Sequence, residues 1–461
     1  MGSGPGGYVA AIRASQLGYK TAIVERESLG GICLNWGCIP TKALIKSAQV
    51  LEYLGHAQDY GIVANDFKAD FGAVIKRSRG VAEKMSKGIQ FLMKKNKIDV
   101  LMGMGKLNAK KEVEVTGADG KTTAYAAKHV ILATGGRARQ LPNLPIDGKK
   151  IIGYREAMNM PAQPKSMIVV GSGAIGVEFA YVYNSLGTKV TIVEFMPRIV
   201  PVEDEDISKE LERVYRKKGI TVMTNASVEK VEGKGSGVVA HVKTAEGVTQ
   251  LEADVVLSAV GVSSNIENIG LETLGIKTEK DKVLVDKYYN TNVAGIYAIG
   301  DIVPGQALAH VAMKEAVICV EAIAHKEGKH HHAPEALDYG NVPGCTYCSP
   351  EIASVGMTEK QAKEAGYEVK VGKFPFSASG KASAAGATEG FVKVVFDAKY
   401  GEWLGTHMIG ANVTEIIAQT VASRKLETTW QEQLDTIFPH PTMSEAVKDA
   451  IEVALGEAIH I

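Results

Sequence analysis

The feature that most constrains this chain is a glycine-rich pattern that occurs twice. Residues 2–7 read GSGPGG and residues 171–176 read GSGAIG. Each copy leads into a segment of helical character and then into a short apolar strand that ends in an acid, Glu25 in the first copy and Glu194 in the second. In both copies the acid lies 23 residues after the first glycine. A pattern repeated with the same internal spacing predicts two copies of one structural unit.

That unit is the β-α-β dinucleotide-binding fold, in which each glycine of the pattern has a physical role. The first glycine permits a tight turn, the second lets backbone N–H groups approach a pyrophosphate, and the third lets the helix pack closely on the strand. The acid accepts the ribose hydroxyls, and a carboxylate at Glu194 favours NAD over NADP because it repels a 2′-phosphate. The predicted cofactor-binding residues are Gly2, Gly4, Gly7 and Glu25 in the first copy and Gly171, Gly173, Gly176 and Glu194 in the second.

The second copy follows an apolar strand at 166–170, opens a helix that runs to about Leu186 and continues into a strand at 189–193. The first copy has only Met1 before it, so the strand that should precede it is missing from the chain. Either the sequence is recorded from an internal start or it is a truncated product. A truncated product would have a weakened cofactor domain, because a central parallel strand is buried on both faces.

Three further predicted strands, at 129–132, 255–257 and 296–299, run into small residues. Small residues at strand ends suit the ligand crevice of an open α/β sheet, although ordinary turn glycine is the simpler interpretation for any one of them. The positions concerned are Thr134 and Gly135, Gly261, and Gly300 with Asp301.

Two cysteines follow the first acid closely, within the segment GGICLNWGCIPTK at 30–42. Cys33 and Cys38 are separated by four residues and lie where a loop enters a predicted helix at 41–54. A dithiol in this position can close a small ring, and a helix N-terminus can lower a thiol pKa. Two buried cysteines acting as small hydrophobic residues are the alternative. Beside two dinucleotide units, the redox-active pair is the favoured interpretation.

Composition excludes several classes of protein. Lys plus Arg and Asp plus Glu both number 52, whereas nucleic-acid binding requires a basic excess. No apolar run approaches 18 residues, and the start lacks the features of a signal peptide, so we expect no membrane association. Five cysteines are too few for a disulfide scaffold, which indicates a reducing compartment and predicts a cytoplasmic protein.

The 30–42 segment resembles the redox motif of the flavoprotein disulfide reductases, which are FAD-dependent pyridine nucleotide-disulfide oxidoreductases. Leu34, Thr41 and Ala43-Leu44 are most similar to the branch that oxidises dihydrolipoamide. The resemblance covers essentially the whole chain. It implies FAD on the first unit, NAD on the second, and reduction of NAD⁺ by dihydrolipoamide through a redox-active disulfide. The implied partners are the lipoyl domains of 2-oxoacid dehydrogenase or glycine-cleavage complexes.

The same resemblance implies roles for individual residues. Cys33 is the thiol that exchanges with substrate, and Cys38 is the thiol beside the flavin. Lys42 lies against the flavin ring and pairs with Glu178. The remaining implied contacts are Asp301 with the ribityl side of the flavin, Ala309 and His310 near it, and Gly261 at the border of the NAD site.

Near the C-terminus, His440 precedes Pro441 and Thr442, and Glu445 follows five residues after the histidine. Thiol–disulfide exchange needs a base because the thiolate is the attacking species. An imidazole with a carboxylate partner has a fixed tautomer and a stabilised cation. A solvated surface histidine is the alternative, but the segment resembles the family's His-Pro-Thr…Glu motif. That motif completes the active site of the other subunit, which implies a homodimer.

The expected fold class is α/β, with two Rossmann-like dinucleotide-binding domains and a C-terminal α+β dimerisation domain. Strands at 391–396 and 404–409 and helices at 414–424 and 444–454 support the last domain. The predicted boundaries are 1–149 for the FAD-binding domain with its first strand missing, 150–262 for the NAD-binding domain, 263–338 for a central domain that completes the FAD site, and 339–461 for the interface domain.

Other features are predicted to be structural. Cys345 and Cys348, near the histidines at 330–332, are interpreted as core cysteines beside a solvated turn, with no metal. Cys319 is expected in the core, and the acidic run 203–206 is expected to be the capped, solvated start of a helix.

Two alternative functions remain open. One is another FAD-dependent disulfide reductase, although glutathione-type enzymes would favour basic residues near Glu194, and mercuric-type and large thioredoxin-type enzymes would need a C-terminal cysteine pair. The other is a truncated, inactive chain that binds no FAD. The sequence does not identify which lipoyl complex is served.

Overall fold

The computed structural model describes residues 1–461 and divides into two compact units. Unit 1 comprises residues 1–43, 72–139 and 261–339, and unit 2 comprises residues 44–71, 140–260 and 340–461. The first glycine pattern and the segment that contains Asp301 lie in unit 1. The second pattern and the C-terminal segment lie in unit 2. The four domain boundaries predicted from the sequence remain a prediction.

The parallel sheet of unit 1 consists of two strand pairs. β1 (Ala22–Glu25) pairs with β2 (Asp99–Met102), and β6 (Val130–Leu132) pairs with β19 (Ile296–Ala298). Between them, Gly2 donates its N–H to Val24 at 2.8 Å, and Ala133 donates to the carbonyl of Met1 at 2.8 Å. Met1 and Gly2 therefore bridge the two strand pairs. They lie where the central strand of such a sheet is expected, the strand that the sequence analysis found missing.

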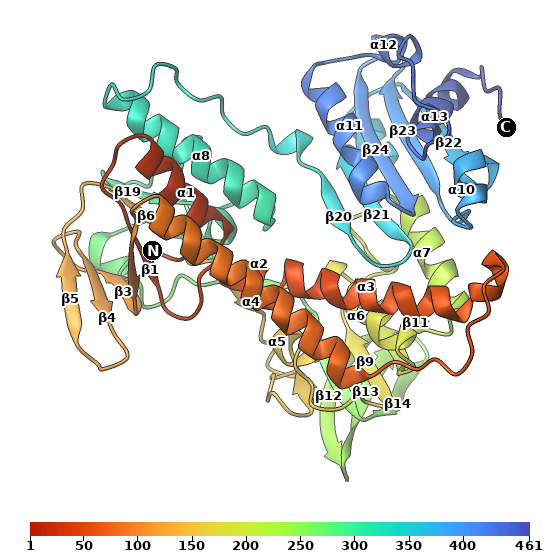
Figure 1. Cartoon of the computed structure of the whole chain (residues 1–461), viewed down its shortest axis with the longest axis horizontal. Coiled ribbons are helices and arrows are strands. Elements are labelled where there is room, and N and C mark those ends of the chain that lie inside the picture. The colour runs from red at the N-terminus through yellow and green to blue at the C-terminus, as the bar shows by residue number, and fades with distance from the viewer. The chain divides into compact units, whose positions relative to one another are not determined.

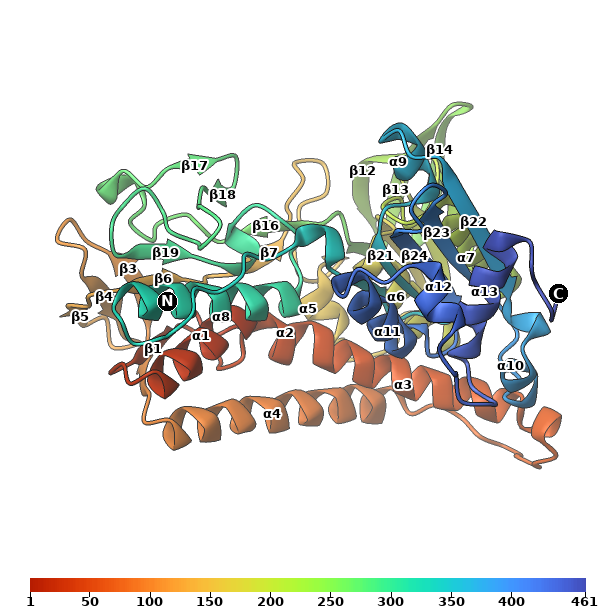
Figure 2. The same ribbon diagram turned by 90° about the horizontal axis from the view of Figure 1, so that it is seen from above.

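Helices cover this sheet because their small and apolar residues face it. α1 (Pro5–Gln16) packs along α8 (Ala309–Lys326), as Figure 1 shows. α4 (Phe71–Lys95) contributes Ile89 and Met93 to a cluster with Ala11 of α1, and it runs beside α1 in Figure 2. Cys319 of α8 is completely buried, which confirms its prediction as a core residue. The antiparallel strands β3 (Met104–Leu107), β4 (Val113–Thr116) and β5 (Thr122–Tyr125) complete this unit's main elements, together with α2 (Gly31–Trp36), β7 (Gly136–Ala138), β16 (Val262–Ser264), β17 (Thr278–Glu279) and β18 (Lys282–Val283).

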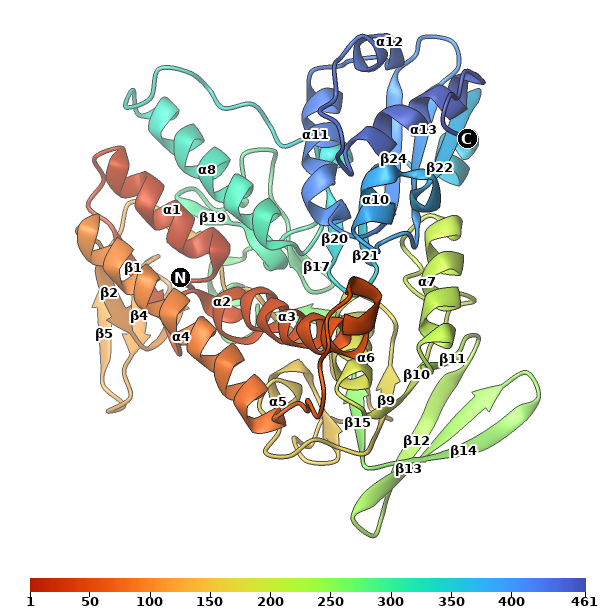
Figure 3. The ribbon, with the colours of Figure 1, turned by 45° about the vertical axis from the view of Figure 1, so that its right-hand side comes forward.

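The second pattern lies in a five-stranded parallel sheet of unit 2, with the order β11-β10-β9-β15-β8. β9 and β10 coincide with the predicted strands, because most of their residues are β-branched or apolar and their Val and Ile residues are buried. An antiparallel sheet of three strands follows, visible in Figure 3. The elements are β8 (Ile151–Ile152), α5 (Tyr154–Ala157), β9 (Ser166–Val170), α6 (Ala174–Ser185), β10 (Lys189–Val193), α7 (Glu205–Lys217), β11 (Thr221–Met223), β12 (Ser227–Lys234), β13 (Gly237–Thr244), β14 (Gly247–Ala253) and β15 (Val255–Ser258).

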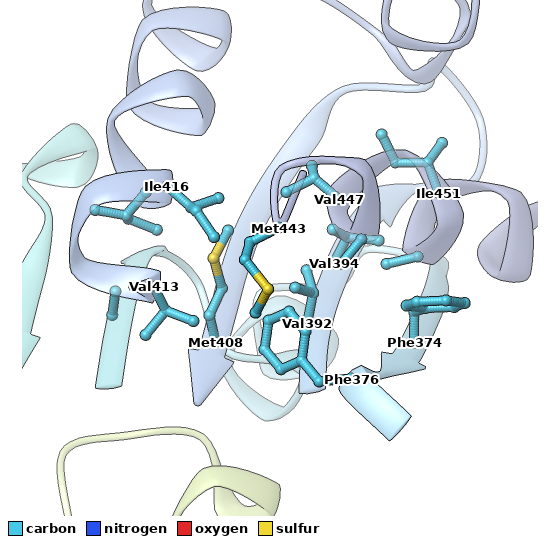
Figure 4. Packing of buried hydrophobic residues seen from close by; sticks show 14 of the residues in the cluster. Phe374, Phe376, Val392, Val394, Met408, Val413, Ile416, Met443, Val447 and Ile451 are labelled. Carbon is cyan, nitrogen blue, oxygen red and sulfur yellow. The ribbon is translucent and has the colours of Figure 1, made fainter. Parts of the chain in front are cut away.

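The C-terminal part of unit 2 is a five-stranded antiparallel sheet with two helices on one face, which confirms the predicted α+β segment. The helices bury Val413, Ile416 and Ile451 against the sheet, and Met408, Met443 and Phe376 meet between them in Figure 4. The strands are β20 (Gly344–Thr346), β21 (Glu351–Gly356), β22 (Val369–Pro375), β23 (Phe391–Asp397) and β24 (Trp403–Gly410), and the helices are α9 (Glu359–Glu364), α10 (Gly380–Ala384), α11 (Val413–Lys425), α12 (Trp430–Leu434) and α13 (Glu445–Leu455).

No helix of the structure combines the length and the apolar character that crossing a membrane would require.

The acidic run at 203–206 differs from its prediction in one respect. Asp204 caps α7 by accepting from the backbone N–H of Asp206 at 3.0 Å, so the predicted cap is confirmed. The predicted solvation is wrong, because Asp204 is buried and pairs with Lys393 at 3.0 Å. Lys393, whose side chain is 5% exposed, also contacts Asp206 at 3.1 Å and Glu359 at 2.8 Å. An ammonium partner from β23 therefore replaces the water that these carboxylates would otherwise need.

Replacing Lys393 with Met should destabilise the protein by about 3–5 kcal/mol, because the remaining carboxylates would be buried without their cation. Urea denaturation measures the free energy of unfolding. The matched control is Lys373→Met, which removes an exposed lysine 3.6 Å from Asp206 and should cost no more than about 1 kcal/mol. Equal stability of K393M and the unmodified chain would contradict a stabilising role for this cluster.

Candidate active site

The first glycine pattern forms a turn in which two positions exclude any side chain. Gly2 has a φ of +96°, and a Cβ there would lie 2.2 Å from the carbonyl oxygen of Ala133. A Cβ on Gly7 would lie 1.9 Å from the carbonyl oxygen of Gly2. At Gly4, by contrast, an added Cβ meets nothing within 4 Å. The turn at the start of α1 thus has open space beside the second glycine, where a phosphate group fits the N–H groups of the helix end.

The second pattern has the same geometry. Gly171 has a φ of +94°, and a Cβ there would lie 2.5 Å from the carbonyl oxygen of Ala259. A Cβ on Gly176 would lie 2.1 Å from the carbonyl oxygen of Gly171, whereas at Gly173 it meets nothing within 4 Å. The repeated sequence spacing therefore corresponds to a repeated arrangement of backbone atoms.

Each acid is held at its turn by a serine that sequence analysis did not assign. Glu25 Oε2 accepts from the backbone N–H of Ser3 at 3.0 Å and from its hydroxyl at 2.6 Å. Glu194 Oε2 accepts from the N–H and hydroxyl of Ser172 at 2.7 and 2.6 Å. Both carboxylates are buried. The occurrence of serine between the first two glycines of both copies was the signal that could have identified Ser3 and Ser172.

A cavity of about 540 Å³ adjoins the end of β1 in unit 1, a volume within the usual range for small-molecule sites. It lies next to Glu25, since Glu25 pairs with Met102 in the β1–β2 register and Met102 lines the cavity. Its walls are formed by Glu27, Ser28, Leu29, Ser86, Gln90, Met93, Lys94, Ile98, Asp99, Val100 and Met102. The lining combines apolar and polar side chains.

The two cysteines lie on either side of a break between helices. Cys33 belongs to α2 and Cys38 is the first residue of α3 (Cys38–Gly55), with Gly37 at φ −145° and ψ −117° between the helices. The helix begins three residues before its predicted start at Thr41, because Pro40 is tolerated in a first helical turn. Both cysteines are partly buried.

The thiols of Cys33 and Cys38 share a hydrogen bond, and this bond and burial raise the pKa of Cys33 well above its ordinary value. The charge of Lys42, one turn along α3, opposes this rise. Sulfur atoms in hydrogen-bonding contact need only a small movement to close a disulfide. This contact is compatible with a redox-active pair.

Lys42 and Glu178 belong to different units. Lys42 lies on the unit 1 part of α3, and Glu178 lies on α6 in unit 2. Glu178 is buried, and its Oε1 accepts from the backbone N–H of Tyr347 at 2.9 Å. Tyr347 is therefore a residue that orients Glu178 and that sequence analysis did not identify. The pairing of Lys42 with Glu178 remains a prediction.

Asp301 follows β19 and meets the loop after β6. A Cβ on Gly136 would lie 3.3 Å from Asp301 Oδ2, which places the carboxyl beside the Thr134–Gly136 segment. Burial raises the pKa of Asp301. Asn265, which sequence analysis did not assign, holds this loop by donating to the carbonyl of Thr134 at 3.0 Å.

Three more predicted positions are located as follows. Ala309 is the first residue of α8 and His310 is the second, so both lie at the N-terminal end of that helix in unit 1. Gly261 has a φ of +104°, and its carbonyl accepts from the N–H of Arg139 at 3.0 Å.

His440 and Glu445 form a pair at the start of α13. Glu445 Oε1 accepts from His440 Nδ1 at 2.8 Å, and Oε2 accepts from the N–H of Thr442 at 2.7 Å. The His440 side chain is 80% exposed. With Nδ1 engaged in this way, Nε2 is the nitrogen that can accept a proton from a substrate.

The Cys345–Cys348 pair and the nearby histidine turn agree with their predictions. Cys348 is completely buried and Cys345 is partly buried in β20, as expected for core residues. In the exposed turn, His330 Nδ1 contacts the carbonyl oxygen of His332 at 2.8 Å, so the predicted solvated turn is confirmed.

Comparison with known proteins connects this geometry to a family. Residues 1–316 match the family described as pyridine nucleotide-disulphide oxidoreductase, and residues 342–451 match its dimerisation domain. The dihydrolipoyl dehydrogenases of Rhizobium etli and Zymomonas mobilis are 52% and 48% identical to the chain, and each alignment covers 100% of this chain and 98% of the relative. The crystal structure of LpdA from Mycobacterium tuberculosis has a TM-score of 0.90 at 27% identity, covering 98% of each chain. The chain therefore belongs to the pyridine nucleotide-disulphide oxidoreductase family.

Proposed function

We propose that this chain oxidises dihydrolipoamide to lipoamide and reduces NAD⁺ to NADH, by way of FAD and the Cys33–Cys38 pair. The observation that carries this proposal is the hydrogen-bonded thiol pair in the same unit as the first glycine turn. The family is FAD-dependent and NAD-linked, and relatives of 42–52% identity over their full lengths are dihydrolipoyl dehydrogenases. The proposed physiological substrates are lipoyl domains of 2-oxoacid dehydrogenase or glycine-cleavage complexes, in the cytoplasm.

The residues present fit both cofactors, because each glycine turn leaves open space beside its second glycine and holds a carboxylate at the adjacent strand end. Bound at these residues, FAD would supply a two-electron acceptor for the dithiol, and NAD⁺ would supply the final hydride acceptor. We assign FAD to Gly2, Gly4, Gly7, Glu25, Lys42, Thr134, Gly135, Asp301, Ala309 and His310, and NAD to Gly171, Gly173, Gly176, Glu194 and Gly261.

His440 starts the proposed reaction by removing a proton from one thiol of dihydrolipoamide at Nε2. Glu445 holds Nδ1–H and stabilises the imidazolium that forms. The substrate thiolate attacks Cys33 Sγ of the oxidised Cys33–Cys38 pair, and Cys38 leaves as a thiolate. The second substrate thiol then attacks the substrate sulfur of this mixed disulfide, the bond from that sulfur to Cys33 Sγ breaks, and Cys33 leaves with the proton of the attacking thiol. Lipoamide closes its ring, the substrate has lost two electrons and two protons, and both cysteines are reduced.

The proposed active site combines residues of two subunits. The chain matches a dimerisation domain, which supports a homodimer. Within one chain the His440 imidazole is largely exposed, although its partner Glu445 is well ordered by Thr442. We propose that the His440–Glu445 pair of one subunit serves the cysteines of the other.

Replacing Gly173 with Ala should weaken NAD⁺ binding without loss of stability. Gly173 has a φ of −65°, which alanine adopts readily, and the space around its Cβ is open in the protein alone. The methyl group would keep the pyrophosphate from the backbone N–H groups, so we expect about a ten- to hundredfold rise in the NAD⁺ dissociation constant with an unchanged Tm. Gly176→Ala is the contrast, because its Cβ would overlap the carbonyl of Gly171 and should lower the Tm. A G173A variant with normal NAD⁺ affinity would exclude the second turn as the pyrophosphate site.

The purified chain supplied with FAD should form NADH from dihydrolipoamide and NAD⁺, measured at 340 nm. NADPH-driven reduction of glutathione should be absent, since the Glu194 carboxylate would repel a 2′-phosphate. The reverse pattern, glutathione reduction without dihydrolipoamide oxidation, would replace the proposed function with that of another reductase of the family.

The Cys33→Ser and Cys38→Ser variants provide the internal controls for this assay. Both should lose NADH formation, because neither can form the disulfide. Cys345→Ser, which changes a partly buried cysteine outside the pair, should retain it.

Replacing His440 with Gln should reduce dihydrolipoamide turnover by about two or more orders of magnitude, because the side chain no longer accepts a proton. The matched control is His460→Gln, since His460 also pairs with a carboxylate of α13, Asp449, at 3.0 Å. Steady-state rates at saturating substrate measure the effect. Full activity of H440Q would remove this histidine from the mechanism.

A further inference from the structure

Glu315 is a buried carboxyl that the proposed reaction does not use. It lies in the second turn of α8 and is 1% exposed, in a chain region whose other buried residues are largely apolar. Burying a carboxyl is costly unless it is hydrogen-bonded, so its partners indicate what it stabilises.

The two carboxyl oxygens of Glu315 accept hydrogen bonds from two different segments of the chain. Oε2 accepts from the backbone N–H of Gly300 at 2.6 Å, and Oε1 accepts from the hydroxyl of Tyr339 at 2.6 Å. The hydroxyl of Tyr289 lies 3.3 Å from that of Tyr339, which extends the network by one further group. All of these residues belong to unit 1.

The bond to Gly300 acts on the turn that presents Asp301. Gly300 has a φ of +74° and begins the short helical turn Gly300–Ile302. On the other side of this turn, the carbonyl of Asp301 accepts from the hydroxyl of Ser264 at 2.7 Å and from Lys282 Nζ at 2.5 Å. The turn is thus held at its first N–H by Glu315 and at the next carbonyl by Ser264 and Lys282. None of these bonds uses the Asp301 carboxyl.

The pKa of Glu315 and its neighbours indicate whether Gly300 needs a charged partner or only a hydrogen-bond acceptor. Burial raises the pKa of Glu315 to about 7, although the bonds from Tyr339 and Gly300 lower it. Asp301 also raises it, because the two carboxyl groups lie close enough to repel each other. A neutral amide could accept from Gly300 and donate to Tyr339, so the geometry requires an acceptor rather than a charge.

We propose that Glu315 is a positioning residue for FAD, which sets the Gly300–Asp301 turn from inside the protein so that the Asp301 carboxyl is oriented toward the flavin's ribityl chain. This inference rests on the proposed function, in which Asp301 contacts FAD. Glu315 itself touches no cofactor atom in this assignment; it acts through the Gly300 N–H.

The test is the rate of FAD release from the holoprotein, followed by the rise in flavin fluorescence after dilution. Glu315→Ala removes the acceptor for Gly300 and should accelerate release about ten- to hundredfold. Glu315→Gln keeps an acceptor and a donor and should remain within about threefold of the unmodified protein. Glu321→Gln, six residues along α8 and paired with Arg13, is the matched control and should have no effect.

A purely structural role is separated from positioning by the Tm of the FAD-free chains and by Tyr339→Phe. If E315A does not fold, Y339F still tests the network, because it removes only the hydroxyl that orients Oε1 and should also accelerate FAD release. Unchanged release in both E315A and Y339F, or release from E315Q as fast as from E315A, would overturn the inference. An unmodified chain that binds no FAD would contradict the proposed function and this inference together, whereas a flavin-loaded chain with unaffected variants contradicts only the inference.

Discussion

The structure depends on the close approach of each glycine turn to the backbone of a neighbouring strand end. In unit 1 the turn at Gly2 lies against the carbonyl of Ala133, and in unit 2 the turn at Gly171 lies against the carbonyl of Ala259. A single methyl group at either glycine would force the strand ends apart. These contacts bring the second glycine, the helix N-terminus and the acid of the next strand to one place, which is what a pyrophosphate and its ribose require.

Buried polar groups fix the positions of turns and strand ends that apolar packing alone does not fix. The serine of each turn holds the carboxylate of its acid, Glu315 holds the Gly300 turn, and Lys393 joins α7 to the C-terminal sheet. In each case a polar atom removed from water has a defined partner, so the bond specifies a position and also avoids a desolvation cost. The site is therefore supported by interactions several residues away from the groups that would contact substrate.

Sequence reasoning predicted the strands at 166–170 and 189–193 to the residue, because uninterrupted β-branched residues beside a glycine turn permit few other structures. It placed the start of α3 three residues late, since local propensity does not show that the cysteine can begin the helix. It also treated the acids at 203–206 as solvated, because their cation lies almost 190 residues away on β23 and no local pattern indicates it.

The sequence by itself determined the duplicated dinucleotide unit, the spacing of Cys33 and Cys38, and the His440–Glu445 pair, because each is encoded by residues close together in the chain. Only the tertiary structure decided that the two thiols share a hydrogen bond, that Asp301 lies beside the Thr134–Gly136 segment, and that Glu315 holds Gly300. The physical reason is the sequence separation over which each kind of interaction acts. Turn sterics and helix periodicity act over a few residues, whereas partners for buried polar groups are found by whichever distant segment the packed core brings within about 3 Å.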